Sequence, residues 1–72
     1  MSVIKVVELI GESHRDWQDA IENAVAQADK TIKNITGVEV QSMTADVDRG
    51  KIVDYKACVR IAFKVEGTDS QL

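Results

Sequence analysis

The sequence contains no proline, one cysteine and one histidine. The lone Cys58 excludes a disulfide within the chain, and the lone His14 leaves no Cys/His cluster for a structural zinc ion. Small domains usually gain stability from such links or from association. At 72 residues, the chain has a marginal core of its own. We therefore expect it to associate with further copies of itself; the alternative is a well-packed monomer.

An excess of basic charge is also lacking. The chain has 9 basic and 12 acidic residues, interspersed, for a net charge of -3. Binding to a phosphate backbone needs a basic stripe, so nucleic acid is not expected as a partner. Apolar runs are too short for a membrane span, and the N-terminus does not have the pattern of a signal peptide. We expect no membrane partner and a cytoplasmic location, which a free thiol fits.

Aromatic residues are scarce, with one each of tryptophan, tyrosine and phenylalanine. Trp17 begins an apolar helical stripe, and Tyr55 and Phe63 share one face of a predicted strand, so we expect all three to pack in the core. A flat cofactor would then find no free aromatic platform. The polar face of that strand offers Lys56 and Arg60 as hydrogen-bond donors to a ligand; the alternative is an ordinary solvated face.

The first half of the chain predicts a strand and a helix. Residues 3–10 are short and rich in β-branched side chains, and Gly11 follows as a turn. Both faces of this strand are apolar, so it needs two packing partners. Ser13 with Asp16 matches a capping pattern, and apolar residues then recur every three or four positions. We expect a helix of about five turns that ends within residues 34–37.

The second half predicts two more strands. In residues 38–47 the alternation of apolar side chains changes phase near Gln41 and Ser42. A β-bulge explains this change, as does a strand that lends its other face to a neighbouring subunit. Residues 48–51 form a short hairpin connection with Gly50 in the left-handed conformation. Residues 53–65 then alternate without a break, with one buried and one largely polar face.

These elements predict an α+β fold with a β-α-β-β order. The helix returns the chain so that the first and second strands run the same way and the last strand opposes both. A three-stranded antiparallel sheet in the order 1-3-2, wrapped around one long helix, follows most simply. We assign the domain to residues 1–66 and a polar C-terminal tail to residues 67–72.

The residues that usually carry catalysis do not form a convincing site. Cys58 and His14 fall on different elements, a strand face and a helix start, so we expect no nucleophile with a base and no enzyme activity. Asp46 and Asp48 lie two apart on a strand and are candidate ligands for calcium or another divalent cation. The alternative is a solvated hairpin end. In a symmetric assembly, carboxylates from several copies also meet at a symmetry axis, where they would form a cation site that one chain does not show.

Several segments together resemble the dodecin family over roughly residues 3–66. They are Lys5-Val6-Val7-Glu8-Leu9-Ile10-Gly11, Ser13 with Trp17 and Ala20, Asn23-Ala24, Lys30-Thr31-Ile32-Lys33-Asn34-Ile35, Val38-Glu39-Val40, and Tyr55 through Phe63. The resemblance implies a β-α-β-β subunit, twelve of which close into a hollow shell. It would also explain the two-sided first strand and the phase change in the second.

Dodecins are known chiefly for sequestering flavins, with pairs of rings held between tryptophans near two-fold axes. The resemblance places Gly37 at that tryptophan position, Lys56 at a glutamine that reads the flavin edge, and Thr44 at an arginine position. One hypothesis is therefore a shell that stores an FMN- or riboflavin-type flavin or a related flat molecule, with these three residues lining a widened pocket. The other is an assembly that binds calcium or another divalent cation, or has a structural role only, as in family members without the aromatics.

Overall fold

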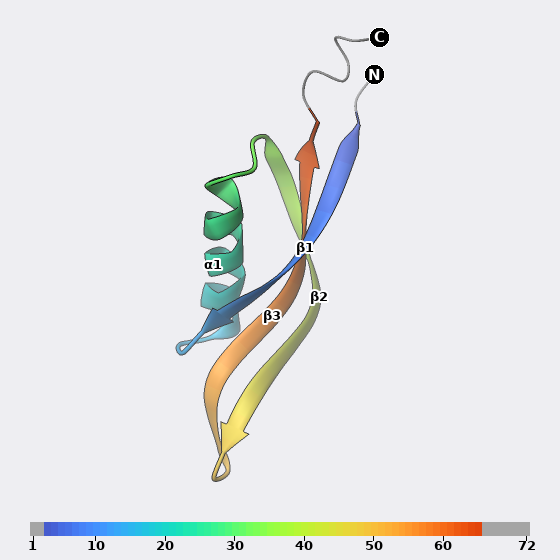
Figure 1. Cartoon of the computed structure of the whole chain (residues 1–72). Helices are drawn as coiled ribbons and strands as arrows, with labels where there is room; N and C mark the ends of the chain where they lie inside the picture. Colours follow the sequence, from blue (N-terminus) through green and yellow to red (C-terminus); the bar gives the residue numbers. More distant parts are fainter. Residues whose placement is uncertain (1–2, 66–72) are drawn as a thin grey trace.

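The structure is a computed structural model that describes residues 3–65. In chain order they form β1 (Ile4–Ser13), α1 (Trp17–Asp29), β2 (Ile35–Asp48) and β3 (Lys51–Lys64). The strands make one antiparallel sheet in the order β1-β3-β2, and α1 packs on one face of it (Figure 1). The predicted α+β fold and strand order are confirmed. The predicted tail, residues 67–72, lies outside the described residues.

Helix α1 begins later than predicted. Its N-cap is Asp16, whose backbone is extended and whose Oδ1 accepts a hydrogen bond from the Asp19 amide at 2.7 Å. Ser13, the predicted cap, is the last residue of β1. Its hydroxyl donates to Asp19 Oδ2 at 2.6 Å and accepts from the Arg15 amide at 2.9 Å. Ser13 therefore shapes the turn before the helix, while the cap itself is a carboxylate that suits the positive end of the helix dipole.

Helix α1 also ends earlier than predicted. It has 13 residues, and Lys30 is its C-cap. The apolar stripe misled the prediction because Ile32 lies past the helix end and still packs against the core. The turn that follows is completed by Asn34, whose positive φ of 64° redirects the chain into β2. Asparagine is one of the residues that tolerate this conformation.

Gly11 lies inside β1, not in a turn after it. A Cβ built at Gly11 would lie 2.0 Å from the Ala20 carbonyl oxygen and 3.0 Å from the Ala24 Cβ. The backbone of β1 and helix α1 therefore approach each other more closely than any side chain allows. This contact requires glycine for its lack of a Cβ.

The core of the single chain is small. Its buried hydrophobic residues are Ala20, Ala24, Ala28, Ala57, Val59 and Ile61. Of these, only Val59 and Ile61 are large. Among residues 3–65, ten larger apolar residues are exposed: Val3, Ile4, Val6, Ile10, Val38, Val40, Met43, Val47, Ile52 and Val53. A chain that exposes more large apolar side chains than it buries has little hydrophobic stabilisation of its own.

The exposed apolar residues of β2 have a simple cause. Helix α1 lies mainly against β1 and β3 and barely touches β2. Val38, Val40 and Met43 pair with buried residues of β3, so they point to the helix side of the sheet, beyond the reach of the helix. The predicted phase change near Gln41 is confirmed, because the register shifts between Val40 and Ser42. The bulge keeps apolar residues on the helix side before and after it.

The β2–β3 hairpin extends well past the helix (Figure 1). Arg49 and Gly50 at its tip have φ of 52° and 76°, the pattern of a two-residue hairpin turn, which confirms the left-handed Gly50. A second register shift separates Asp46 from Val47 and leaves Val53 opposite no residue of β2. Val53 was predicted to be buried but is 47% exposed, because this bulge breaks the alternation of β3.

Trp17 and Tyr55 form the aromatic contact between α1 and the sheet. Their ring centroids are 4.9 Å apart, with the planes at 81°, an edge-to-face arrangement. The Trp17 indole also donates a hydrogen bond to the Thr44 carbonyl oxygen at 2.8 Å. Both rings and Phe63 are half-buried. All three were predicted to pack in the core, but none belongs to the buried core of the described residues. Among residues 3–65, the one helix is too short and too polar to cross a membrane.

Candidate functional site

The sheet has one face without a helix, which we call the open face. Cross-strand partners share a face of a sheet, so the register assigns the side chains of this face. The described residues of β3 that belong to it include Lys56, Cys58, Arg60 and Ala62, and their partners on β1 are Glu12, Ile10, Glu8 and Val6. On β2 their partners are Thr44, Ser42, Glu39 and Gly37. The open face is therefore a mixed surface that spans all three strands.

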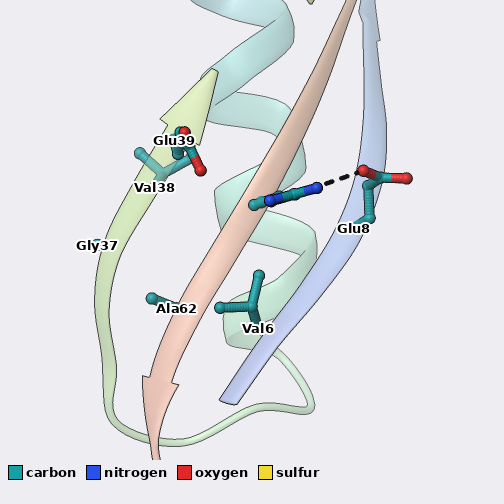
Figure 2. A pocket seen from close by; sticks show the side chains of 7 residues that line it. Val6, Glu8, Gly37, Val38, Glu39 and Ala62 are labelled. Carbon is teal, nitrogen blue, oxygen red and sulfur yellow. Dashed lines mark ion pairs between the residues drawn. The ribbon is translucent and has the colours of Figure 1, made fainter. Parts of the chain in front are cut away.

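A cavity of about 570 Å³ lies on the open face near the start of β2 (Figure 2). It is lined by Val6, Glu8, Gly37, Val38, Glu39, Arg60 and Ala62. Gly37 leaves the β2 side of the cavity bare, since a Cβ added there would meet no atom within 4 Å. The volume falls within the range of small-molecule sites, which combine an apolar lining with a few polar groups.

The polar groups of the cavity are one cation and two anions. Arg60 Nε lies 3.6 Å from Glu8 Oε2, a contact between β3 and β1 (Figure 2). Glu39 is the partner of Arg60 on β2. The side chains of Arg60 and Glu8 are 49% and 59% exposed, so their ion pair is solvated and adds little to stability. These side chains remain accessible to a ligand.

The two other predicted pocket residues, Thr44 and Lys56, lie farther along the sheet. They are cross-strand partners on the open face, but neither lines the cavity that contains Gly37. Lys56 Nζ lies 3.1 Å from Asp46 Oδ2, and a hydrogen bond and charge attraction from Asp46 raise the pKa of Lys56. Within one chain, the structure brings Thr44 and Lys56 together and leaves Gly37 apart from both.

The predicted metal ligands do not meet in one site. Asp46 is engaged by Lys56, and Asp48 is the partner of Lys51 at the start of the hairpin turn. Within the described part of the chain, no three histidine, cysteine, aspartate or glutamate side chains gather closely enough to hold a metal ion. A cation at Asp46 or Asp48 would therefore need further ligands, such as backbone carbonyl oxygens, water or carboxylates from another copy.

A carboxyl cluster that the sequence did not reveal lies beside the turn between β1 and α1. Asp54 is only 9% exposed, and its Oδ1 lies 3.4 Å from His14 Nδ1. A hydrogen bond with Asp54, and then the charge of Asp54, raise the pKa of Glu12. Asp54 was expected on a solvated face. It is nonetheless buried, beside Glu12 and His14, and no periodicity in the sequence shows these neighbours.

Glu12 should make the stability of the protein depend on pH. Its pKa is raised above the ordinary 4.5, so folding favours the protonated carboxyl. The resulting stabilisation is full below the unfolded pKa and is lost as the pH rises through the folded pKa. Glu12→Gln, which cannot ionise, should therefore gain in melting temperature over the unsubstituted protein as the pH rises from 4 to 7. Thermal unfolding at matched protein concentration measures this difference.

The matched control for this prediction is Glu22→Gln on α1. Glu22 is an exposed carboxylate that accepts a hydrogen bond from Gln18 at 3.1 Å, and its replacement should give no such pH-dependent gain. A constant difference between Glu12→Gln and the unsubstituted protein at every pH would contradict a shared proton between Glu12 and Asp54.

Comparisons with known proteins agree with this architecture. The family model described as Dodecin matches residues 3–66. The dodecin of Thermus thermophilus is 30% identical over 66 residues, which cover 92% of this chain and 96% of that protein. The calcium dodecin of Mycobacterium tuberculosis is 31% identical over 65 residues, with coverages of 90% and 92%. A Thermus thermophilus crystal structure superimposes with a TM-score of 0.90 at 29% identity, over 94% of this chain and all of that one. The chain belongs to the dodecin family.

Proposed function

We propose that the chain is a subunit of a dodecin-type homododecameric shell that binds and stores a flat, flavin-type ligand. The observation that carries this proposal is the cavity on the open face, with apolar walls, three charged side chains and a bare β2 side at Gly37. Nothing in the arrangement calls for catalysis: the role is binding, with ligand held and released unchanged.

The exposed apolar surface supports assembly. Val38, Val40 and Met43 on β2 are 43%, 42% and 57% exposed, on the helix side of the sheet but beyond the part that α1 covers. Contiguous apolar surface of this kind is typical of protein–protein contacts. Burial of these side chains against a second copy would supply the stabilisation that the small core lacks. Twelve copies per shell is the family expectation for this chain.

The flavin part of the proposal is tested by titration. Riboflavin or FMN is held at a fixed concentration, the purified protein is added, and flavin fluorescence is followed together with the mass of the particle. Quenching that saturates, on a particle of twelve subunits, is the expected result. Full flavin fluorescence beside excess protein would exclude flavin storage, and a monomeric mass would exclude the shell.

A divalent cation is the second candidate ligand. The observation in its favour is the similarity to a protein named calcium dodecin, together with carboxylates at Asp46 and Asp48 near the hairpin tip. A ligand that binds only the folded state raises the melting temperature, and the rise grows with the logarithm of ligand concentration above the dissociation constant. Added calcium should then raise the melting temperature and a chelator should lower it. If neither changes it while flavin fluorescence also stays constant, a purely structural assembly remains.

A further inference from the structure

Two rows of side chains cross the cavity from strand to strand. The first, the small row, consists of Val6, Ala62 and Gly37, which are cross-strand partners. The second, the charged row, consists of Glu8, Arg60 and Glu39, also partners in register. The rows lie two residues apart along each strand, so they are adjacent on the same face. One half of the cavity floor is therefore apolar and shallow, and the other half is polar.

Arg60 has donors to spare for a ligand. A guanidinium carries five N–H donors, and the contact with Glu8 involves Nε at 3.6 Å, which is longer than a hydrogen bond. No hydrogen bond from this guanidinium to another residue within 3–65 is formed. Its side chain is 49% exposed, so its donors are open to the cavity.

Glu39 provides the opposite hydrogen-bonding character. It lies on the β2 side of the cavity beside Gly37 (Figure 2), and it makes no ion pair with another of the residues 3–65. An ionised carboxylate only accepts hydrogen bonds. Arg60 and Glu39 therefore offer donors next to an acceptor, directly beside the apolar small row.

We propose that Arg60 and Glu39 determine which ligand the cavity takes: a flat heteroaromatic molecule with an apolar ring and one edge that carries carbonyl oxygens beside an N–H group. The ring lies on the small row, Arg60 donates to a carbonyl oxygen, and Glu39 accepts from the N–H. This inference rests on the proposed ligand-binding function and names the residues that read the ligand. Lys56, which the family resemblance places at the edge-reading position, is the rival reader.

The test compares riboflavin with N3-methylriboflavin, in which a methyl group replaces the hydrogen of the edge N–H. Dissociation constants are measured by fluorescence for the unsubstituted protein, Arg60→Gln, Glu39→Leu and Lys56→Met. A hydrogen bond to a charged group contributes about tenfold to a hundredfold in affinity. Arg60→Gln should weaken riboflavin binding by that factor. The unsubstituted protein should bind the methylated compound correspondingly less tightly, and Glu39→Leu, which has no acceptor, should lose this discrimination.

Arg49→Gln is the matched control, because it removes a positive charge at the hairpin tip, away from the cavity. It should leave both dissociation constants unchanged. Equal binding by Arg60→Gln and the unsubstituted protein would overturn the proposal. Loss of the discrimination in Lys56→Met, while Glu39→Leu keeps it, would overturn it too. A change of particle mass in Arg60→Gln would mean that the charged row contacts a second copy, which also overturns it. If the unsubstituted protein binds neither compound, the proposed flavin function itself fails.

Discussion

Replacing Gly11 by alanine is expected to lower the melting temperature by about 10–20 °C. The added Cβ would lie 2.0 Å from the Ala20 carbonyl oxygen, which belongs to the helix backbone and cannot rotate away as a side chain would. Overpacking usually costs about 1–3 kcal/mol and sometimes more, and about 1 kcal/mol corresponds to 4–8 °C in a domain of this size. Thermal unfolding at fixed protein concentration measures the loss.

Gly37→Ala is the control for this substitution. A Cβ at Gly37 meets nothing within 4 Å, and Gly37 is not among the residues with positive φ. Its melting temperature should stay within a few degrees of that of the unsubstituted protein, since surface changes usually fall within about 0.5 kcal/mol. Equal melting temperatures for Gly11→Ala and Gly37→Ala would show that β1 and α1 separate at little cost.

The fold was predictable because the strands of this chain carry strong patterns. The unbroken alternation of β3 identified the central strand, and its buried residues Val59 and Ile61 are the large members of the core. The change of phase at Gln41 was visible because a one-residue slip moves every following side chain to the other face. The order 1-3-2 was predictable from strand direction, because a last strand that opposes the other two makes the sheet antiparallel when it lies between them, and the structure has this order.

The helix boundaries were harder to predict because two residues competed for one role. Ser13 and Asp16 are both good N-caps, and the sequence pattern favours the serine when an acidic residue follows three positions later. In the structure Ser13 still pairs in β1, opposite Tyr55, so its backbone is not free to begin a helix. Strand pairing, which depends on a residue 42 positions away, decided between the two caps.

The site was only partly visible for the same reason. Lys56, Arg60 and Gly37 were recognised as accessible positions, and the register places all three on the open face. Glu8 and Glu39 were missed as cavity residues because nothing local in the sequence distinguishes a glutamate that lines a cavity from one on an ordinary surface. Their place in the cavity follows from the strand register, which aligns Glu8 of β1 and Glu39 of β2 on either side of Arg60.

The open face also explains how this chain can differ from a flavin site built on aromatic walls. Position 37 is glycine, so no aromatic ring is available there for stacking. In the proposed function, hydrogen bonds from the charged row would therefore carry more of the binding. A ligand held in this way should depend strongly on the pattern of its polar edge and weakly on the extent of its ring system. One substitution, glycine to tryptophan at position 37, would supply an aromatic ring for stacking.

Gly37→Trp is expected to strengthen flavin binding by about tenfold to a hundredfold. Stacking of a flat ring on an aromatic side chain contributes roughly 1–3 kcal/mol, and every 1.4 kcal/mol corresponds to about tenfold in affinity. The position has room for the indole, because no atom lies within 4 Å of a Cβ there, and it borders the cavity beside Ala62 and Glu39. The measurement is the dissociation constant of riboflavin by fluorescence quenching.

Gln18→Trp is the matched control, since it adds the same indole at an exposed position of α1, on the other side of the sheet. It should leave riboflavin binding unchanged, which separates stacking in the cavity from non-specific attraction to an added tryptophan. If the Gly37→Trp and Gln18→Trp proteins form particles of equal mass and bind riboflavin equally tightly, the β2 wall of the cavity does not face the ligand. The assignment of Gly37 to the ligand site would then have to be abandoned, and the binding surface sought elsewhere on the open face, around Thr44 and Lys56.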